Sequence, residues 1–164
     1  MPSLRLLGID PGLVGTGYGL IEAASGTVVV VASGVVHTDN HRPLEARLQM
    51  IYDAVDRLLA EHEPSTLVLE DLYADYSFPR TALQMAHARG VICLAARQRG
   101  VTVMGLAPAA VKRAIAAHGG ASKAQIQEGV RRFLKLDAAP KSTHVADALA
   151  LALTGFWRVG GRLA

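Results

Sequence analysis

LRLLGIDPG, residues 4–12, fixes how the fold begins, because it joins a buried strand to a tight turn. The apolar pattern predicts a strand from Leu4 to Asp10, and Asp10-Pro11-Gly12 has the composition of a turn. Two more strands are predicted at Gly15–Ala23 and Thr27–Thr38, the second of them rich in β-branched valine. The domain is therefore expected to open with three consecutive antiparallel strands.

Downstream of this segment the sequence alternates helical and strand patterns. Apolar residues recur at helical spacing from Leu44 to Leu59, after a proline that is typical of a helix start. We predict an α/β fold with a mixed five-stranded sheet, three antiparallel strands first, flanked by helices. The later strands are expected at Thr66–Glu70 and Val101–Leu106, and the later helices at Arg80–Arg99, Pro108–His118, Ser122–Leu136 and Ser142–Trp157.

Chain length and one apolar helix bear on domain organisation. The 164 residues suit a single domain, 1–164, whose last few residues are expected to be loose. The stretch from Ala86 to Ala96 is apolar on nearly every face. Such a helix is either buried centrally or packed against another subunit.

Composition argues against several classes of protein. No apolar run approaches the roughly 20 residues of a membrane-spanning helix. Asp10 interrupts the apolar stretch near the N-terminus, so the layout of a signal peptide is missing. Cys93 is the single cysteine, which excludes a disulfide within the chain and a cysteine-based zinc site. We expect a cytoplasmic protein with no membrane partner.

Charge is divided unevenly along the chain. Residues 1–82 hold five Lys and Arg against eleven Asp and Glu, whereas residues 83–164 hold twelve against three. A basic half favours a polyanionic partner, most commonly nucleic acid. Basic side chains that merely keep helix faces soluble would give the same pattern, so charge alone leaves both interpretations open.

Four residues carry the candidate chemistry. Asp10 and Glu70 each end a predicted apolar strand, where an ionised carboxylate is costly to bury without a partner. His144 and Asp147 are three residues apart on a predicted helix, so they project from one face. Three carboxylates and an imidazole form a ligand set suited to Mg²⁺ or Mn²⁺. Each residue alone also has an ordinary structural explanation, such as a turn, a solvated strand end or an ion pair.

Phosphodiester cleavage accounts for such a ligand set. In-line displacement needs an activated water, neutralised phosphoryl oxygens and a stabilised leaving oxygen, which two cations about 3.5–4 Å apart supply together. No serine or cysteine stands with a clear histidine and acid partner, which argues against covalent catalysis. We therefore expect two ions in each active site.

The same residues lie in a series of motifs that spans nearly the whole chain. The series opens with Gly8-Ile9-Asp10-Pro11-Gly12 and Gly15-Thr16-Gly17-Tyr18-Gly19, and continues with Leu69-Glu70-Asp71-Leu72-Tyr73. It is completed by Ala88-Arg89-Gly90-Val91, Ala107-Pro108 with Val111-Lys112, Ser122-Lys123 and Ala146-Asp147-Ala148-Leu149-Ala150. In order and spacing these motifs resemble the RuvC family of Holliday-junction resolvases.

The resemblance implies an RNase H-like fold and a homodimer. It also implies a metal-dependent endonuclease that resolves four-way junctions by paired symmetric nicks in recombination and repair, with a functional link to a branch-migration motor. The family's metal-binding acidic residues fall on Asp10, Glu70 and Asp147. Its base-stacking aromatic residue falls on Tyr73, and its DNA-contacting lysines fall on Lys112 and Lys123.

This chain departs from the family pattern at three positions. His144 stands where some members carry Asp and others His, and it shifts the expected metal preference toward softer ions such as Mn²⁺. Asp71 is Gln in some relatives and adds a negative charge near the scissile phosphate. Whether this charge favours or opposes cleavage is left open. Tyr73 replaces the more usual Phe and keeps the π-face that stacking uses.

The glycines at 12, 15, 17 and 19 match neither a Walker loop nor the pattern G-x-G-x-x-G. They indicate either a strand that another part of the chain approaches closely or the close passage of a DNA phosphate. The sequence alone does not choose between the two.

Three other functions compete with junction cleavage. A phosphotransferase of the actin and sugar-kinase type needs two such domains to enclose ATP, and this chain supplies one. A non-catalytic junction- or RNA-binding module has no need to bring three carboxylates and a histidine together. An RNase H-like nuclease acting on another nucleic acid is the alternative that the sequence excludes least well.

Overall fold

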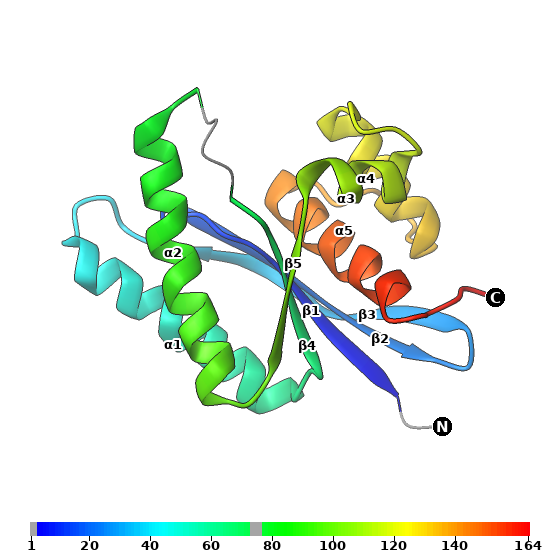
Figure 1. The fold of residues 1–164 in the computed structure, drawn as a ribbon, viewed down its shortest axis with the longest axis horizontal. Coiled ribbons are helices and arrows are strands. Elements are labelled where there is room, and N and C mark those ends of the chain that lie inside the picture. The colour runs from blue at the N-terminus through cyan, green and yellow to red at the C-terminus, as the bar shows by residue number, and fades with distance from the viewer. Residues whose placement is uncertain (1–2, 73–76) are drawn as a thin grey trace.

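The computed structural model describes residues 3–72 and 77–164, and its centre is one five-stranded mixed sheet (Figure 1). The strand order is β3-β2-β1-β4-β5. β1 pairs antiparallel with β2, and β2 pairs antiparallel with β3, whereas β4 runs parallel to both β1 and β5. The three antiparallel opening strands are thus confirmed. The bounds are β1 (Leu4–Asp10), β2 (Gly15–Ala24), β3 (Thr27–His37), β4 (Thr66–Glu70) and β5 (Thr102–Leu106).

Helices cover both faces of the sheet (Figure 1). The helices α1 (Leu44–His62) and α2 (Pro79–Gln98) pack on one face. On the other face α5 (Thr143–Arg158) lies directly against the strands, and α3 (Pro108–Ala116) and α4 (Lys123–Phe133) pack beyond it.

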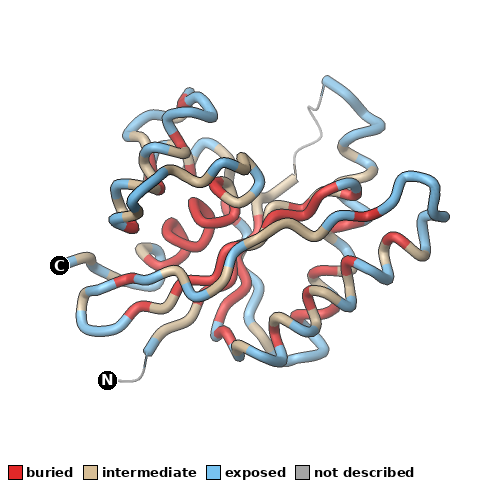
Figure 2. Tube along the Cα trace, turned by 180° about the vertical axis from the view of Figure 1, so that it is seen from behind, coloured by how far each residue is buried: buried red, intermediate tan, exposed pale blue. Residues whose placement is uncertain are grey.

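Strand periodicity sorts the core into two layers. Successive side chains of a strand point to opposite faces, so Leu7 and Ile9 pack with the α1–α2 layer while Leu6 packs with the α5 layer. In β4, Leu67 and Val68 divide in the same way. Because both faces are covered, these strands are apolar at nearly every position. Figure 2 shows the central strands and α5 as the most continuously buried part of the chain.

Glycines let α5 approach the sheet closely. A Cβ at Gly17 would overlap the backbone carbonyl of His144, and one at Gly8 would overlap the carbonyl of Ala148. A Cβ at Gly19 would overlap the side chain of Leu149. Of the two interpretations open for the glycine-rich strand, close approach by another part of the chain is therefore confirmed for Gly17 and Gly19. This contact holds the first turns of α5 against the ends of β1 and β2.

α4 and α5 begin beside the serines where the sequence predicted their starts, and two helices end earlier than expected. Ser122 forms a capping box with Gln125 at the start of α4, and the Ser142 side chain accepts from the Val145 N–H. α3 stops at Ala116 because Ala117 adopts a left-handed backbone conformation, with φ 66°. α4 stops at Phe133.

The chain end makes contacts although we expected its last residues to be loose. The Ala164 N–H donates to the Gly26 carbonyl at 2.9 Å, and Leu163 packs against the core. None of the helices in the described ranges is both long and apolar enough to cross a membrane.

The sequence predicted that the apolar helix, now α2, is either buried centrally or packed against another subunit. Central burial is wrong, because only one face of α2 is buried. Its inner face, which includes Ala88 and Ile92, is buried against the sheet and α1. Its outer face leaves Leu83 64% exposed and Leu94 51% exposed. Phe78, just before the helix, is 74% exposed. The apolar stripe at Phe78, Leu83 and Leu94, called here the α2 stripe, has no partner among the described residues.

Candidate active site

Three segments bring the candidate catalytic residues to one edge of the sheet. β1 and β4 are parallel neighbours, with Ile9 opposite Leu69, so Asp10 and Glu70 leave the sheet at the same edge. The first turns of α5 reach this edge because of the glycine contacts, and they carry His144 and Asp147. The residues that the sequence singled out at four separate places are therefore neighbours.

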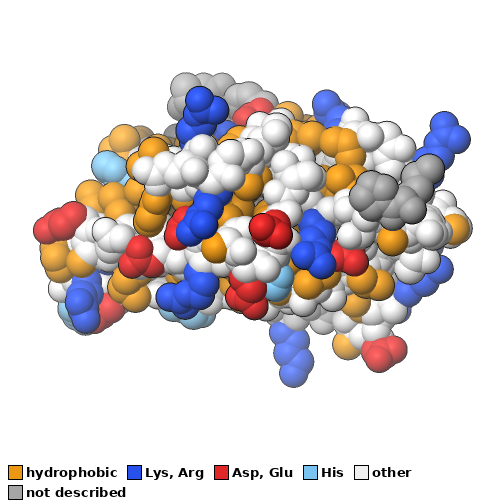
Figure 3. Space-filling model, turned by 90° about the horizontal axis from the view of Figure 1, so that it is seen from below, with side chains coloured by type: hydrophobic (Ala, Val, Ile, Leu, Met, Phe, Trp, Pro, Cys, Tyr) orange, Lys and Arg blue, Asp and Glu red, His pale blue; other side chains and the backbone are white. Residues whose placement is uncertain are grey.

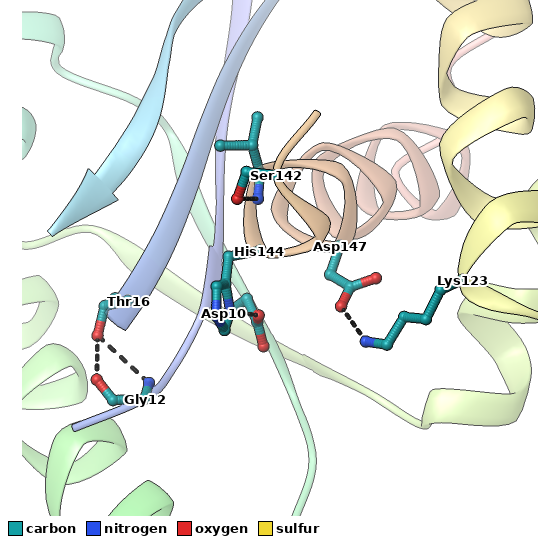
Figure 4. A network of polar contacts seen from close by, with 8 residues as sticks. Asp10, Gly12, Thr16, Lys123, Ser142, His144 and Asp147 are labelled. Atoms are coloured by element: carbon teal, nitrogen blue, oxygen red, sulfur yellow. Dashed lines mark hydrogen bonds and ion pairs between the residues drawn. The ribbon is translucent and has the colours of Figure 1, made fainter. Parts of the chain in front are cut away.

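Three of these side chains, those of Asp10, His144 and Asp147, take part in two polar pairs (Figure 4). His144 Nδ1 lies 2.9 Å from Asp10 Oδ2. Lys123 Nζ, which comes from the start of α4, donates to Asp147 Oδ2 at 2.7 Å. Within the described residues, no three His, Cys, Asp or Glu side chains are close enough together to hold one ion. His144 and Asp147 share a helix face as predicted, yet each has a different partner in this structure.

Burial and mutual repulsion oppose the negative charge of the carboxylates. Desolvation, followed by the charges of Asp10 and Asp147, raises the pKa of Glu70 to about 7. Burial also raises the pKa of Asp10, although the hydrogen bond with His144 acts in the opposite direction. The site thus holds more negative charge than its own residues neutralise, which favours the binding of a cation.

Both predicted DNA-contacting lysines border this group. Lys112 from α3 and Lys123 from α4 line a cleft together with Glu70 and Asp147. Although burial acts against it, the hydrogen bond and charge of Asp147 raise the pKa of Lys123. An ion pair was one of the ordinary structural explanations that the sequence left open, and Asp147 forms one with Lys123. The ammonium group of Lys123 partly neutralises this candidate catalytic carboxylate.

The other predicted residues have different outcomes. Tyr73 lies outside the described residues. Asp71 Oδ1 is 3.5 Å from Arg89 Nη2, and the Asp71 carboxylate occupies the space where a Cβ at Gly105 would lie. Thr16 was not singled out, although its hydroxyl donates to the Gly12 carbonyl at 2.7 Å and fixes the turn after Asp10 (Figure 4). In the sequence, the position of Thr16 between Gly15 and Gly17 was the feature that could have indicated this role in the turn.

The uneven division of charge along the sequence does not divide the face seen in Figure 3 into a basic and an acidic part. Lys and Arg side chains are intermixed with Asp and Glu side chains on this face. At the cleft, Lys112 and Lys123 lie beside the carboxylates of Glu70 and Asp147.

Comparison with known proteins agrees with this arrangement. The family model described as "Crossover junction endodeoxyribonuclease RuvC" matches residues 6–155. A protein of that name from Fusobacterium nucleatum is 38% identical over 98% of this chain and 84% of its own length. Its counterpart from Rhodococcus opacus is 42% identical over 94% of this chain and 82% of its own length.

Solved structures agree in fold. The structure titled "T. thermophilus RuvC in complex with Holliday junction substrate" is 33% identical, with a TM-score of 0.88 over 96% of this chain and 97% of that one. The expected RNase H-like fold is thereby confirmed. On its sequence motifs, its fold and the placement of its acidic residues, this chain belongs to the RuvC family of crossover junction endodeoxyribonucleases.

Proposed function

We propose that this protein resolves Holliday junctions in the cytoplasm by nicking two opposed strands, in recombination and repair. The observation that carries the proposal is the convergence of Asp10, Glu70, His144 and Asp147 at one sheet edge, beside a cleft lined by Lys112 and Lys123. A structure of a relative from T. thermophilus is titled as a complex with a Holliday junction substrate. Phosphodiester hydrolysis at this edge is the reaction that these groups suit best.

Divalent cations, Mg²⁺ or Mn²⁺ and two in each site, complete the catalytic group. The carboxylates of Asp10, Glu70 and Asp147 and the imidazole of His144 would hold these ions. Hard oxygen donors and excess negative charge suit such ions, and the raised pKa of Glu70 supports the assignment. Such ions would neutralise the phosphoryl oxygens and activate water. With a cation held at Asp147, Lys123 would lose its ion pair with that carboxylate, and its ammonium group would be available to the phosphate backbone of the substrate.

DNA binding uses the two lysines and an aromatic residue. Lys112 and Lys123 come from different helices and both line the cleft, where they contact phosphates of the scissile strand. Tyr73 stacks on a base near the crossover, since its position in the sequence follows Glu70 by three residues. The family resemblance supports these three assignments.

The active assembly is a homodimer. A two-fold dimer presents two identical sites, which matches the approximate symmetry of an opened junction and the pair of cuts that resolution needs. The α2 stripe is the surface that supports this proposal, because Phe78, Leu83 and Leu94 leave an apolar face exposed. The proposal includes a functional link to a branch-migration motor.

Cleavage assays test the proposed function. The protein is incubated with a four-way junction, a linear duplex and an RNA–DNA hybrid, with and without Mg²⁺ or Mn²⁺. We expect symmetric nicks on the junction alone, in the presence of metal. Cleavage of the hybrid instead would favour an RNase H-like nuclease of another specificity, and binding without cleavage would favour a junction-binding module.

Substitutions assign the roles. Asp10→Asn, Glu70→Gln and Asp147→Asn should each reduce cleavage by about 10³-fold or more while junction affinity in metal-free buffer stays within about threefold, because binding depends on phosphate contacts and chemistry on the cations. Cleavage at the parental rate by any one variant would remove that residue from the site.

A further inference from the structure

Two arginines of the α1–α2 layer donate to main-chain carbonyls beside the catalytic carboxylates. Arg47 of α1 donates from Nη2 to the Leu13 carbonyl at 3.2 Å, three residues after Asp10. Arg89 of α2 donates from Nε to the carbonyl of Glu70 itself at 3.3 Å. Both helices lie on the face of the sheet opposite α5 (Figure 1), so neither arginine belongs to the helix that carries His144 and Asp147.

Arg47 ties together three segments. Besides the Leu13 carbonyl, its Nε donates to Thr38 Oγ1 at 2.9 Å and its Nη2 to Asn40 Oδ1 at 3.0 Å. The Thr38 hydroxyl in turn donates to the Leu13 carbonyl. The turn between β1 and β2 is therefore held by the guanidinium of α1 and by the end of β3.

The burial of Arg47 is unusual for a group of its charge. The residue is 8% exposed, and none of the described carboxylates forms an ion pair with it, since its partners are a carbonyl, a hydroxyl and an amide oxygen. Burying a cation without an opposite charge is costly. Arg47 lies on the buried face of α1, one turn from Ile51. An apolar side chain at position 47 would avoid the cost of burying a charge, so the hydrogen bonds of the guanidinium are the reason for an arginine there.

The turn that Arg47 holds supports the catalytic pair. Gly15 closes the turn and lies beneath the His144 imidazole, because a Cβ at Gly15 would stand 3.7 Å from His144 Nε2. Asp10, which precedes the turn, is bonded to His144 Nδ1. A shift of this turn would therefore move both Asp10 and the surface on which His144 rests.

Arg89 acts in the same way at the end of β4. Its guanidinium spans the Glu70 carbonyl and the Asp71 carboxylate. The Asp71 N–H donates to the Leu106 carbonyl at 2.8 Å, which attaches this segment to β5. The sequence left the effect of the Asp71 charge open, and the structure shows that this carboxylate is a partner of Arg89.

We infer that Arg47 and Arg89 are positioning residues that hold the carboxylate-bearing ends of β1 and β4 in register with α5. The planar guanidinium with several fixed donors suits this task, since the single ammonium of lysine cannot bridge the same acceptors. This inference rests on the proposed function and concerns the geometry of that same site. A displacement of about 1 Å at such a site can reduce the rate about 100-fold.

Substitutions that keep the volume of the side chain test the inference. Arg47→Met and Arg89→Met remove the donors, Arg47→Lys and Arg89→Lys keep the charge, and Thr38→Val removes one bond of the Arg47 network. Arg57→Met on α1 and Arg97→Met on α2 are matched controls, because both arginines are exposed. Single-turnover cleavage, metal-free junction affinity, Mn²⁺ affinity of the DNA-free protein and thermal melting are measured for each.

We expect the methionine variants to lose about 10- to 100-fold in cleavage rate, and the lysine variants and Thr38→Val to lose less. Junction affinity should stay within about threefold of the parent, and Mn²⁺ affinity should fall. Hydrogen exchange should accelerate in residues 11–16 for the Arg47 variants and in residues 66–72 for the Arg89 variants. The controls should match the parent in every measurement.

A purely structural role would give a different result. Lower melting temperatures with parental cleavage by the folded fraction and parental Mn²⁺ affinity would overturn the inference. If the parent itself failed to cut junctions, the proposed function would fail, and local hydrogen exchange with Mn²⁺ affinity would still decide whether the two arginines hold the site.

Discussion

The raised pKa of Glu70 makes folding stability depend on pH. Its pKa is raised to about 7, mainly by burial, whereas an unfolded glutamate titrates near its ordinary value of 4.5. Between these values the folded state holds a proton that the unfolded state releases, so folding stability falls as pH rises through this window. The loss of folding stability is complete above the folded pKa of about 7, and it is absent below the unfolded pKa of 4.5.

Glu70→Gln should therefore stabilise the metal-free protein at pH 8 by about 1–3 kcal/mol, because the neutral amide avoids the cost of a buried charge. The gain should vanish at pH 4. Urea denaturation in EDTA at both pH values measures it, with Glu45→Gln on the exposed first turn of α1 as the control. An equal effect at both pH values would show that ionisation of Glu70 is not its cause.

His144 provides a second test at the residue scale. Its Nδ1 is bonded to Asp10, which leaves Nε2 as the ring atom able to bind an ion. Imidazole binds a metal only when it is neutral, so protons compete with metal at this position as pH falls. His144→Asp should remain active, extend cleavage to lower pH and tolerate Mg²⁺ better relative to Mn²⁺.

His144→Ala should lose about 10- to 100-fold in cleavage rate, with partial rescue at higher metal concentration. Rates measured against pH and metal concentration check both variants. Parental cleavage with unchanged metal dependence in His144→Ala would mean that His144 is not a ligand.

At the scale of elements, the contact between β2 and α5 sets the position of the site. Gly17 faces the backbone of His144 with no room for a Cβ. Gly17→Ala should therefore destabilise the fold by about 2–3 kcal/mol, because neither backbone can give way without moving the other. The folded fraction should also cut more slowly, since α5 carries both His144 and Asp147.

Chemical denaturation and single-turnover cleavage measure these two effects. Gly119→Ala is the control, because a Cβ there meets its neighbours at 3.4 Å or more, and its stability should stay within about 0.5 kcal/mol of the parent. A Gly17→Ala protein as stable as this control would contradict the packing argument.

At the scale of the whole molecule, the proposed homodimer is tested on the α2 stripe. If this stripe is the dimer interface, Leu83→Lys combined with Leu94→Lys should yield a monomer, because two charges on an apolar face oppose its burial. Junction affinity should then fall by about 100-fold through loss of the second binding surface. Sedimentation velocity and junction titration measure the two effects.

Two exposed valines on the edge strand β3 supply the matched control. Val29 is 50% exposed and Val31 is 40% exposed, so Val29→Lys with Val31→Lys introduces the same charges elsewhere. This control should remain dimeric. A monomeric control with a dimeric α2 variant would place the interface on the β3 edge instead.

Periodicity and residue type along the chain account for the helices and strands and for the chemical character of the site. Alternating and helical periodicities act over a few residues, so the strands, most helix starts and the shared face of His144 and Asp147 could be predicted from local spacing. The motif resemblance added the family and the fold. Arg47 also left a signal, because it is a charged residue on the apolar face of its helix.

Which side chains meet depends on how the helices pack on the sheet. The pair of His144 with Asp10 and the pair of Lys123 with Asp147 join distant parts of the chain, and local spacing carries no information about such contacts. The raised pKa of Glu70 and the exposure of Leu83 and Leu94 depend on what surrounds each group in space. Burial and charge are properties of the assembled layers, so they could not be read before α5, α2 and the sheet were placed against one another.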